Sequence, residues 1–341
     1  MIPENKKEAV KKSMQVAFGA DDFEEIQELV KGLSSALIFK IVVHGKPYLL
    51  RIVMRSDAIA EPSRYYGSMQ VAAGAALAPP IYYLNSEDRI SITGFVEEKP
   101  FTLDSAREKM PKIIRDLHSL PKFPYRLQYF ESMEGFMEKF RAARLLPDNL
   151  TADLFEQYDR IAHVYPLRDL ADWVSCHNDL KPENIIFDGI RPWLVDWESA
   201  FLNDPYLDLA MVANFVVRNE KEEEDFLAGY FNKPIIEYEK ARLFLMQQLL
   251  HVYYFTFFIL STAQGKPVDV STIEEHDFRI FHDCIWRGEI SLATAQPKLE
   301  YAWVHRNKFL QNVNDKRFKE SIEIISSQKS LMMNHSRGAS A

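Results

Sequence analysis

Four residues in two short segments carry the side chains from which a phosphoryl-transfer site can be built. The segment CHNDLKPENII places His177, Asp179 and Asn184 in the pattern H-x-D-x-x-x-x-N. An apolar run with acidic ends, WLVDWE, follows and adds Asp196. Transfer of a phosphoryl group to a hydroxyl needs a base, an amide metal ligand and a carboxylate metal ligand. The two segments supply these parts in that order.

Each of these residue types indicates a role. Asp179 is the predicted catalytic base, because its carboxylate can accept or orient the proton of the attacking hydroxyl. Asn184 and Asp196 are the predicted metal ligands, since an amide and a carboxylate oxygen suit Mg²⁺ and do not suit zinc. Lys181 can contact the transferred phosphate as a point charge, or be an ordinary solvated loop lysine. His177 is expected to brace the loop rather than to carry a proton.

The composition indicates a soluble globular protein: of 341 residues, 47% are hydrophobic and 26% charged. A formal charge of −8 argues against nucleic acid as a general partner. The only cysteines are Cys176 and Cys284, which fits a reducing compartment. The N-terminal sequence MIPENKKEAVKK mixes charges and has no apolar signal core. We therefore expect a cytoplasmic location.

The chain before Glu97 is predicted to be rich in short strands. A helix is expected over Glu4–Lys31, with Asp21 and Asp22 as caps before its second part. Short β-branched and apolar runs, separated by turn residues, predict two strand pairs. The expected strands are Ala36–Val43, Tyr48–Val53, Ile81–Leu84 and Ile90–Val96, with a helix over Ser63–Ala76 between the pairs.

Beyond the hinge expected near Gly94–Glu98, apolar residues recur at helical spacing. A short hairpin across Asp188-Gly189 joins the two motif segments. The uncharged stretch Leu243–Gly265 is long enough to raise the question of a membrane, but we expect a buried helix and no membrane insertion. The expected fold is α+β with two lobes: a small antiparallel β N-lobe over residues 1–97 and a larger, mostly helical C-lobe over residues 98–341.

The motif residues also carry a family resemblance. HNDLKPEN, followed by VDWESAFLNDPYLDLA at Val195–Ala210, resembles the small-molecule branch of the protein-kinase-like superfamily. That branch contains the aminoglycoside phosphotransferases and the choline/ethanolamine kinases. The resemblance implies a protein-kinase-like fold, ATP and Mg²⁺ as cofactors, and a small-molecule hydroxyl acceptor. It also implies that Asp208 braces the catalytic loop.

The resemblance extends, less specifically, to nucleotide-binding residues. It implies that Gly32, Ser34 and Ser35, in KGLSSA, form a loop that covers the phosphates, and that the strand residue Arg51 binds them. It also implies that Phe95 and Val96 form a hinge that pairs with adenine, and that Ile186 and Val195 form an apolar floor under the base. By its residue type alone, Arg51 could equally be an edge-strand arginine. The family's helix Glu that pairs with this arginine is missing from Ser63–Ala76, so either Glu61 takes its place or the pair is replaced. Glu198 stays open between a metal ligand and an ion-pair partner.

Two other functions are opposed by the same motifs. A protein kinase would carry an arginine at Asn178, Phe-Gly after Asp196, and a long activation segment ending in Ala-Pro-Glu. A catalytically weak, kinase-shaped binding protein is a further alternative, but such proteins usually lose the base or a metal ligand, and this chain retains all three. We therefore expect an enzyme, a phosphotransferase with an alcohol group as acceptor.

The acceptor is less well indicated. Gln247, His251, Tyr254 and Phe258 share one helix face, with Tyr253 and Phe257 beside them. Together with Trp286 or Trp303, they could line a pocket that holds a quaternary ammonium by cation–π attraction, or they could be an aromatic core stripe. We expect a choline- or ethanolamine-type amino alcohol. An aminoglycoside, the alternative, would need a dense acidic pocket, and Asn219–Asp225 (NEKEEED) instead predicts the solvated start of a helix capped by Asn219. Sugars, homoserine and thiamine stay open as acceptors.

Overall fold

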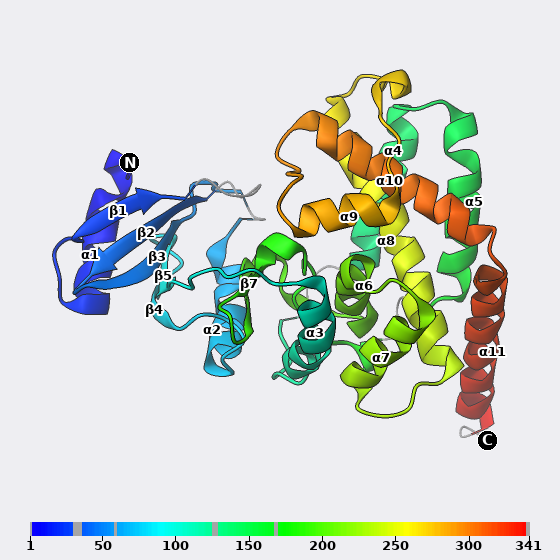
Figure 1. Cartoon of the computed structure of the whole chain (residues 1–341), viewed down its shortest axis with the longest axis horizontal. Helices are drawn as coiled ribbons and strands as arrows, with labels where there is room; N and C mark the ends of the chain where they lie inside the picture. Colours follow the sequence, from blue (N-terminus) through cyan, green and yellow to red (C-terminus); the bar gives the residue numbers. More distant parts are fainter. Residues whose placement is uncertain (1, 30–35, 58–59, 125–128, 167–169, 339–341) are drawn as a thin grey trace. The chain divides into compact units, whose positions relative to one another are not determined.

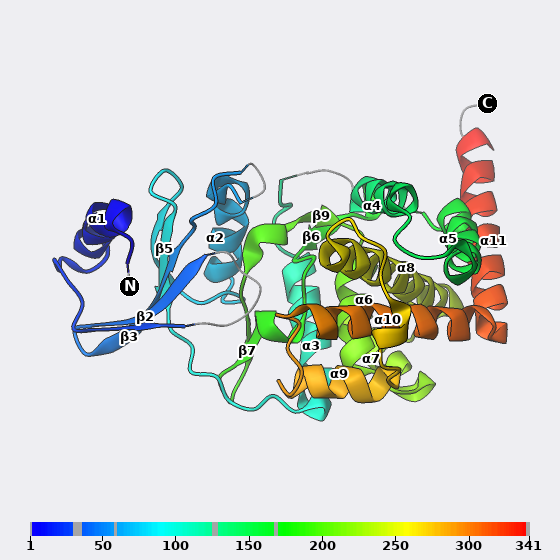
Figure 2. The ribbon, with the colours of Figure 1, turned by 90° about the horizontal axis from the view of Figure 1, so that it is seen from above.

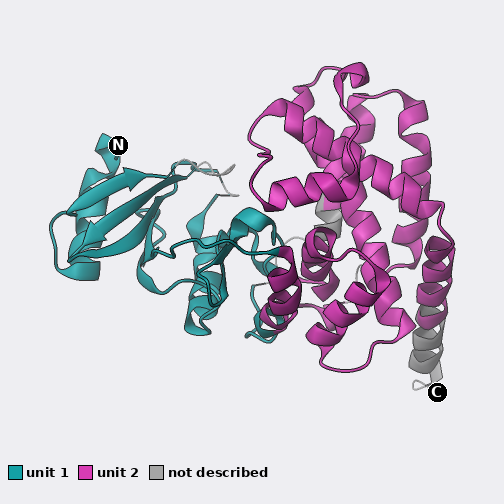
Figure 3. Cartoon of the chain, in the orientation of Figure 1, with its two compact units in different colours: residues 1–102, 116–124, 175–202 teal, residues 103–115, 125–174, 203–341 magenta. Residues whose placement is uncertain are grey.

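The computed structural model describes residues 2–29, 36–57, 60–124, 129–166 and 170–338 (Figure 1). They form two compact units, unit 1 with residues 1–102, 116–124 and 175–202, and unit 2 with the rest (Figure 3). The α+β fold class is confirmed. Unit 1 extends past the lobe boundary expected at residues 97 and 98, and it includes the catalytic segment 175–202.

A five-stranded antiparallel sheet, in the order β1-β2-β3-β5-β4, organises the N-terminal part of unit 1 (Figure 1). Its strands are β1 Glu25–Glu28, β2 Leu37–Val43, β3 Lys46–Ile52, β4 Ile81–Asn85 and β5 Ile90–Gly94. The β2–β3 connection turns at His44 and Gly45, whose φ angles of 51° and 69° are both positive. Two positive φ angles are what a two-residue hairpin turn of matching twist requires. Both predicted strand pairs are confirmed.

The helix predicted over Glu4–Lys31 is only partly correct. Helix α1, Lys7–Phe18, ends at Gly19, which is left-handed with φ 66°. The following segment becomes strand β1, in which Ile26 pairs with Ile41. Cross-strand pairing outweighs the helix propensity of the glutamates and glutamine here. Helix α1 packs on the sheet through Val10 and Met14 (Figures 1 and 2).

The remaining elements of unit 1 are short and surround the motif residues. The β7–β8 hairpin appears where the sequence predicts it, with Ile186 opposite Trp193. Strands β6 and β9 form a separate two-stranded sheet. The bounds are α2 Tyr66–Gly74, β6 Val174–Cys176, β7 Ile185–Phe187, β8 Pro192–Leu194 and β9 Phe201–Asn203, with 3-10 turns η2 Pro62–Arg64, η5 Pro182–Asn184 and η6 Trp197–Ser199.

Unit 2 is helical, with α8 at its centre and α4, α5, α6, α10 and α11 packed around it (Figure 2). The helices, of which α3 ends within unit 1, are α3 Leu103–His118, α4 Tyr129–Ala143, α5 Ala152–Val164, α6 Pro205–Val216, α7 Glu220–Phe231, α8 Glu237–Ala263, α9 Phe278–Trp286, α10 Ala295–Val313 and α11 Lys316–Gly338. Among the described residues, α8 is the one helix long and apolar enough to cross a membrane. Because 72% of its most apolar 18-residue window is buried inside the structure, a core helix accounts for it, as expected.

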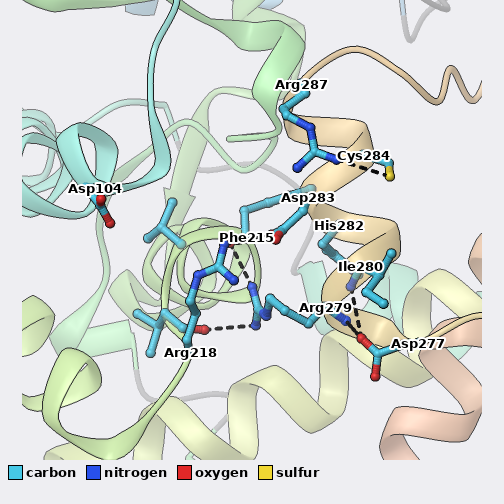
Figure 4. Close-up of polar contacts among 12 residues, drawn as sticks. Asp104, Phe215, Arg218, Asp277, Arg279, Ile280, His282, Asp283, Cys284 and Arg287 are labelled. Carbon is cyan, nitrogen blue, oxygen red and sulfur yellow. Dashed lines mark hydrogen bonds and ion pairs between the residues drawn. The ribbon is translucent and has the colours of Figure 1, made fainter.

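Arginine side chains fix α9 against the end of α6 (Figure 4). The Arg279 guanidinium donates to the carbonyls of Asn214, Phe215 and Val217 at 3.1, 2.8 and 2.8 Å. These are carbonyls that the last turn of a helix leaves without helical partners. Beside it, Arg218 contacts both carboxylate oxygens of Asp283, at 3.0 and 2.9 Å. This cluster therefore caps the C-terminal end of α6 and has a structural role.

Candidate active site

The β7–β8 hairpin brings the two predicted metal ligands to one end. Ile185 pairs with Leu194, and the Val195 amide donates to the Asn184 carbonyl at 3.0 Å. Asn184 directly precedes β7, and Asp196 follows β8 by two residues. Antiparallel pairing therefore places these residues side by side although eleven residues separate them in the chain.

Asp179, the predicted base, is joined to Asn184 and Lys181. Its Oδ2 accepts hydrogen bonds from Asn184 Nδ2 and Lys181 Nζ, each at 2.9 Å. Asn184 Nδ2 also donates to the Asp179 carbonyl at 2.8 Å. Burial alone would lower the pKa of Lys181, but the charge and hydrogen bond of Asp179 outweigh it and raise that pKa. About a third of the Asp179 side chain stays exposed, so a hydroxyl can reach it.

The two residues that directly precede the base, His177 and Asn178, hold the segment that carries Asp196. His177 Nε2 lies 2.9 Å from the Val195 carbonyl, and its ring lies 4.9 Å from that of Trp197. These contacts are those of the brace that the sequence predicts. Asn178 Nδ2 donates to the carbonyls of Ser199 and Phe201. The motif H-x-D-x-x-x-x-N gives Asn178 no role, and its place directly before the base was the available signal.

Arg51 lies on a central strand, where it pairs with Ile38 on β2 and Ser91 on β5, so an edge-strand arginine is excluded. Its guanidinium forms an ion pair with Asp196, with Nη2 3.1 Å from Oδ1, and a hydrogen-bonded ion pair with Glu198. Glu61 pairs with Arg89 instead. The family's helix carboxylate is thus replaced by Glu198, whose pKa is raised by burial against the opposing effect of Arg51.

The oxygen atoms at this end of the hairpin fit a magnesium ion. Apart from the ion pair with Arg51 at 3.1 Å, Asp196 Oδ1, which is buried, accepts no well-aligned hydrogen bond from the part of the chain that the structure describes. The Asn184 amide nitrogen is turned to Asp179, which leaves the amide oxygen as its cation ligand. A carboxylate and an amide oxygen are hard ligands of the kind that Mg²⁺ prefers. The two residues would hold the ion.

The predicted adenine-binding residues lie in segments that the structure links. Phe95 and Val96 follow β5 and are half-buried. Three residues on, the Lys99 amide donates to the Phe187 carbonyl of β7 at 2.7 Å, next to half-buried Ile186. Val195 is half-buried as well. Their contact with a base stays a prediction, and the predicted phosphate loop residues Gly32, Ser34 and Ser35 lie outside the described residues.

The aromatic face of α8 divides into core and half-buried parts. His251 is buried, with Nδ1 2.8 Å from His305 Nδ1, and Phe258 is buried too, so both belong to the core. Trp303 is 8% exposed and carries the Arg306 guanidinium 4.9 Å from its ring centre. The half-buried rings on this helix are Tyr253, Tyr254 and Phe257.

The acidic segment Asn219–Asp225 forms the start of α7 and is mostly exposed, as predicted. Asn219 caps α7 as predicted, because its side chain accepts from the Glu222 amide at 3.0 Å. The expected solvation is wrong for Glu223, which is 6% exposed and paired with Arg317. Lys221 pairs with Asp225 at 2.7 Å.

Comparison with known proteins agrees with this geometry. The sequence is 26% identical over 231 residues to the protein LicA of Haemophilus influenzae, an alignment that covers 62% of this chain and 82% of that protein. A choline/ethanolamine kinase family protein from Mesorhizobium loti superposes with a TM-score of 0.68 at 18% identity, over 94% of this chain and 99% of that one. The choline kinase LicA from Streptococcus pneumoniae superposes with a TM-score of 0.59 at 17% identity, over 89% and 100%.

The two structural matches establish the fold, and the sequence pattern of one family establishes the relationship. The phosphotransferase enzyme family matches residues 25–244, more than half of the chain. That range contains Arg51 and every motif residue from His177 to Asp196. The chain belongs to the phosphotransferase enzyme family.

Proposed function

We propose that the protein is an ATP-dependent kinase that phosphorylates the hydroxyl of a small amino alcohol of the choline or ethanolamine type. One observation carries the reaction class: Asp179 contacts Asn184, Arg51 contacts Asp196, and the hydrogen bond from the Val195 amide to the Asn184 carbonyl links the two pairs within unit 1. The residues that we assign as the base, the two metal ligands and the phosphate-binding cation of a kinase site all belong to that unit.

The chemistry assigned to these residues is an in-line displacement. The acceptor oxygen forms a bond to the γ-phosphorus of ATP, the bond from that phosphorus to the β–γ bridging oxygen breaks, and ADP leaves. Asp179 takes the hydroxyl proton, while Lys181, beside it, offers a positive charge to the transferred group. Mg²⁺, held by Asn184 and Asp196, supplies charge neutralisation at the phosphates when bound.

Arg51 is assigned to the nucleotide phosphates. Its guanidinium is 12% exposed, and it is held in place by two carboxylates that are themselves about one-third exposed. Such a cation is positioned before the nucleotide arrives, which reduces the ordering that binding requires. Phe95, Val96, Ile186 and Val195 are assigned to the adenine, and Gly32, Ser34 and Ser35 to the phosphates.

An amino-alcohol acceptor is supported by aromatic faces and by the names of similar proteins. Tyr253 and Phe257 stack with ring centres 5.7 Å apart, and Tyr254 lies 5.8 Å from Tyr301. Aromatic faces attract ammonium groups by cation–π interaction. Two superposed structures are named as choline or choline/ethanolamine kinases. The alternative aminoglycoside acceptor is disfavoured because Glu223 and Asp225 are already paired.

A coupled ADP-release assay with Mg²⁺-ATP tests the proposal. Choline, ethanolamine, an aminoglycoside and a hexose are offered separately as acceptors, and ADP release without an acceptor is the control. We expect acceptor-dependent turnover with choline or ethanolamine. Turnover of the aminoglycoside and of neither amino alcohol would reject the acceptor class. Failure to bind or hydrolyse ATP would reject the enzyme.

A further inference from the structure

We propose that Asn178 is a positioning residue that fixes the metal-binding carboxylate of Asp196 relative to the base Asp179. The inference rests on the proposed kinase function and adds a residue that the phosphoryl-transfer motif leaves unassigned. Asn178 directly precedes the base in the chain, and it is 5% exposed.

The backbone of Asn178 is left-handed, with φ 64°. Asparagine is among the few residues other than glycine that adopt this conformation readily. The conformation turns the chain between β6 and the catalytic loop. It accounts for part of the residue's identity, but it does not require the amide group, since glycine would serve as well.

The amide group has its own task. Nδ2 donates to the Ser199 carbonyl at 2.8 Å and to the Phe201 carbonyl at 3.2 Å, and lies 3.5 Å from the Cys176 carbonyl. Ser199 closes η6, the 3-10 turn that begins directly after Asp196. The side chain therefore ties the residue before the base to the turn after the metal ligand.

His177 makes the complementary contact on the other side of Asp196. Its Nε2 lies 2.9 Å from the carbonyl of Val195, the residue before Asp196. Consecutive residues 177 and 178 thus hold the segment at residues 195 and 199, and Asp196 lies between these two points. Asp196 itself is left-handed, with φ 64°, so its position depends on the segment that flanks it.

Two substitutions separate the hydrogen bonds from the backbone conformation. N178G keeps the left-handed backbone and removes the amide, and N178D keeps the shape but replaces the donor by an acceptor facing two carbonyls. Both tolerate positive φ. Asn232 is a matched control, because it is an exposed left-handed asparagine that ends α7 in unit 2, and N232D should behave as wild type.

The readout is the Mg²⁺ dependence of steady-state turnover on the amino alcohol that the wild type accepts. Loss of a group that orients a metal ligand typically costs about 10- to 100-fold in metal affinity or activity. We expect both variants to lose kcat by about that factor, and to need more Mg²⁺ for half-maximal rate. The acceptor KM should change by less than about threefold.

Three outcomes decide against the inference. Wild-type kcat and Mg²⁺ dependence in N178G and N178D would overturn it, and so would a loss of kcat with an unchanged Mg²⁺ concentration for half-maximal rate. Failure of both variants to fold, judged by circular dichroism, would show a purely structural role. A wild-type protein that phosphorylates no acceptor would instead reject the proposed function.

Discussion

Each unit contains an arginine paired with two carboxylates, and the two groups have opposite characters. In unit 1, Arg51 pairs with Asp196 and Glu198, whose side chains are 30% and 35% exposed. In unit 2, Arg242 is 5% exposed and pairs with Asp204, which is 1% exposed, and with Asp172. The Tyr206 ring lies 4.6 Å from the Arg242 guanidinium. The two groups have the same residue types. They differ in the solvent exposure of their carboxylates and in whether the carboxylate oxygens can still bind a ligand.

A ligand site can be distinguished from a structural ion pair by the partners that its carboxylate already has. Asp204 is fully committed, because it also caps α6 by accepting from the Tyr206 amide at 2.8 Å. Asp196 Oδ1 has the Arg51 ion pair at 3.1 Å but accepts no well-aligned hydrogen bond from the described residues, and its side chain is 30% exposed. An ionised carboxylate has about four lone-pair sites, so one that is partly exposed beside a single cation can still bind a further ligand. Unit 1 therefore has capacity for a cation, whereas the Arg242 group serves α6 and α8.

The largest difference in stability is expected when each of the two arginines is replaced by methionine. Arg242→Met leaves Asp204 buried without its cation, and breaking a buried pair in this way costs about 3–5 kcal/mol of unfolding free energy. Arg51→Met should cost about 1 kcal/mol or less, because its carboxylates can hydrate, but it should weaken ATP binding. Urea unfolding and nucleotide titration of both variants measure this. Equal losses of stability would remove the distinction.

Asp196→Ala tests the catalytic half of the comparison. Removal of a carboxylate that holds the metal should lower turnover by at least about 100-fold, since such an ion contributes several kcal/mol to the transition state. Mg²⁺-dependent nucleotide binding should weaken as well. Calorimetric ATP titrations with Mg²⁺ and with EDTA distinguish the two contributions. A variant with unchanged Mg²⁺ dependence would show that another residue holds the ion.

The buried histidines of unit 2 predict a loss of stability in acid. Burial lowers the pKa of His251, His282 and His305, to about 3 for His282. Because their unfolded pKa is near 6.5, the unfolded state binds more protons below that pH. Stability is full above pH 6.5 and falls as pH drops toward 3, by up to about 1.4 kcal/mol per pH unit for each histidine.

Urea unfolding at pH 7.5 and pH 5.5 measures this slope, and His282→Phe should flatten it. The residue packs against Phe278 and Phe215, with ring centres 4.0 and 4.9 Å away, so an aromatic replacement suits the site. An unchanged slope in the variant would show that His282 does not stay neutral in the folded protein.

The smallest effect is expected at Asn219, which caps α7 and belongs to neither arginine group. Asn219→Ala should lower stability by about 1 kcal/mol, the usual worth of a helix N-cap. Turnover at saturating substrate should stay unchanged. Thermal unfolding and the ADP-release assay check both statements, and a loss of turnover here would mean that unit 2 helix ends influence the chemistry.

Local patterns were predictable from the sequence, and distant pairings were not. The motif spacing and the β7–β8 hairpin depend on neighbouring residues, so Asn184 and Asp196 could be placed together in advance. Strand β1 could not, because its helix-forming residues are held by Ile41 and its neighbours in β2. The Arg51–Glu198 pair spans 147 residues, and only the folded sheet brings it together. Asn178 was missed because its task depends on backbone carbonyls, which leave no residue signature.

The most direct test of the central claim is ³¹P NMR detection of the phosphorylated acceptor, with wild type and Asp179→Ala compared at equal nucleotide occupancy. We expect a phosphate monoester of choline or ethanolamine from the wild type. In the variant its rate should fall by about 10²- to 10⁴-fold, the usual contribution of a general base, while ATP still binds. Monoester formation at the wild-type rate by Asp179→Ala would show that Asp179 is not the catalytic base.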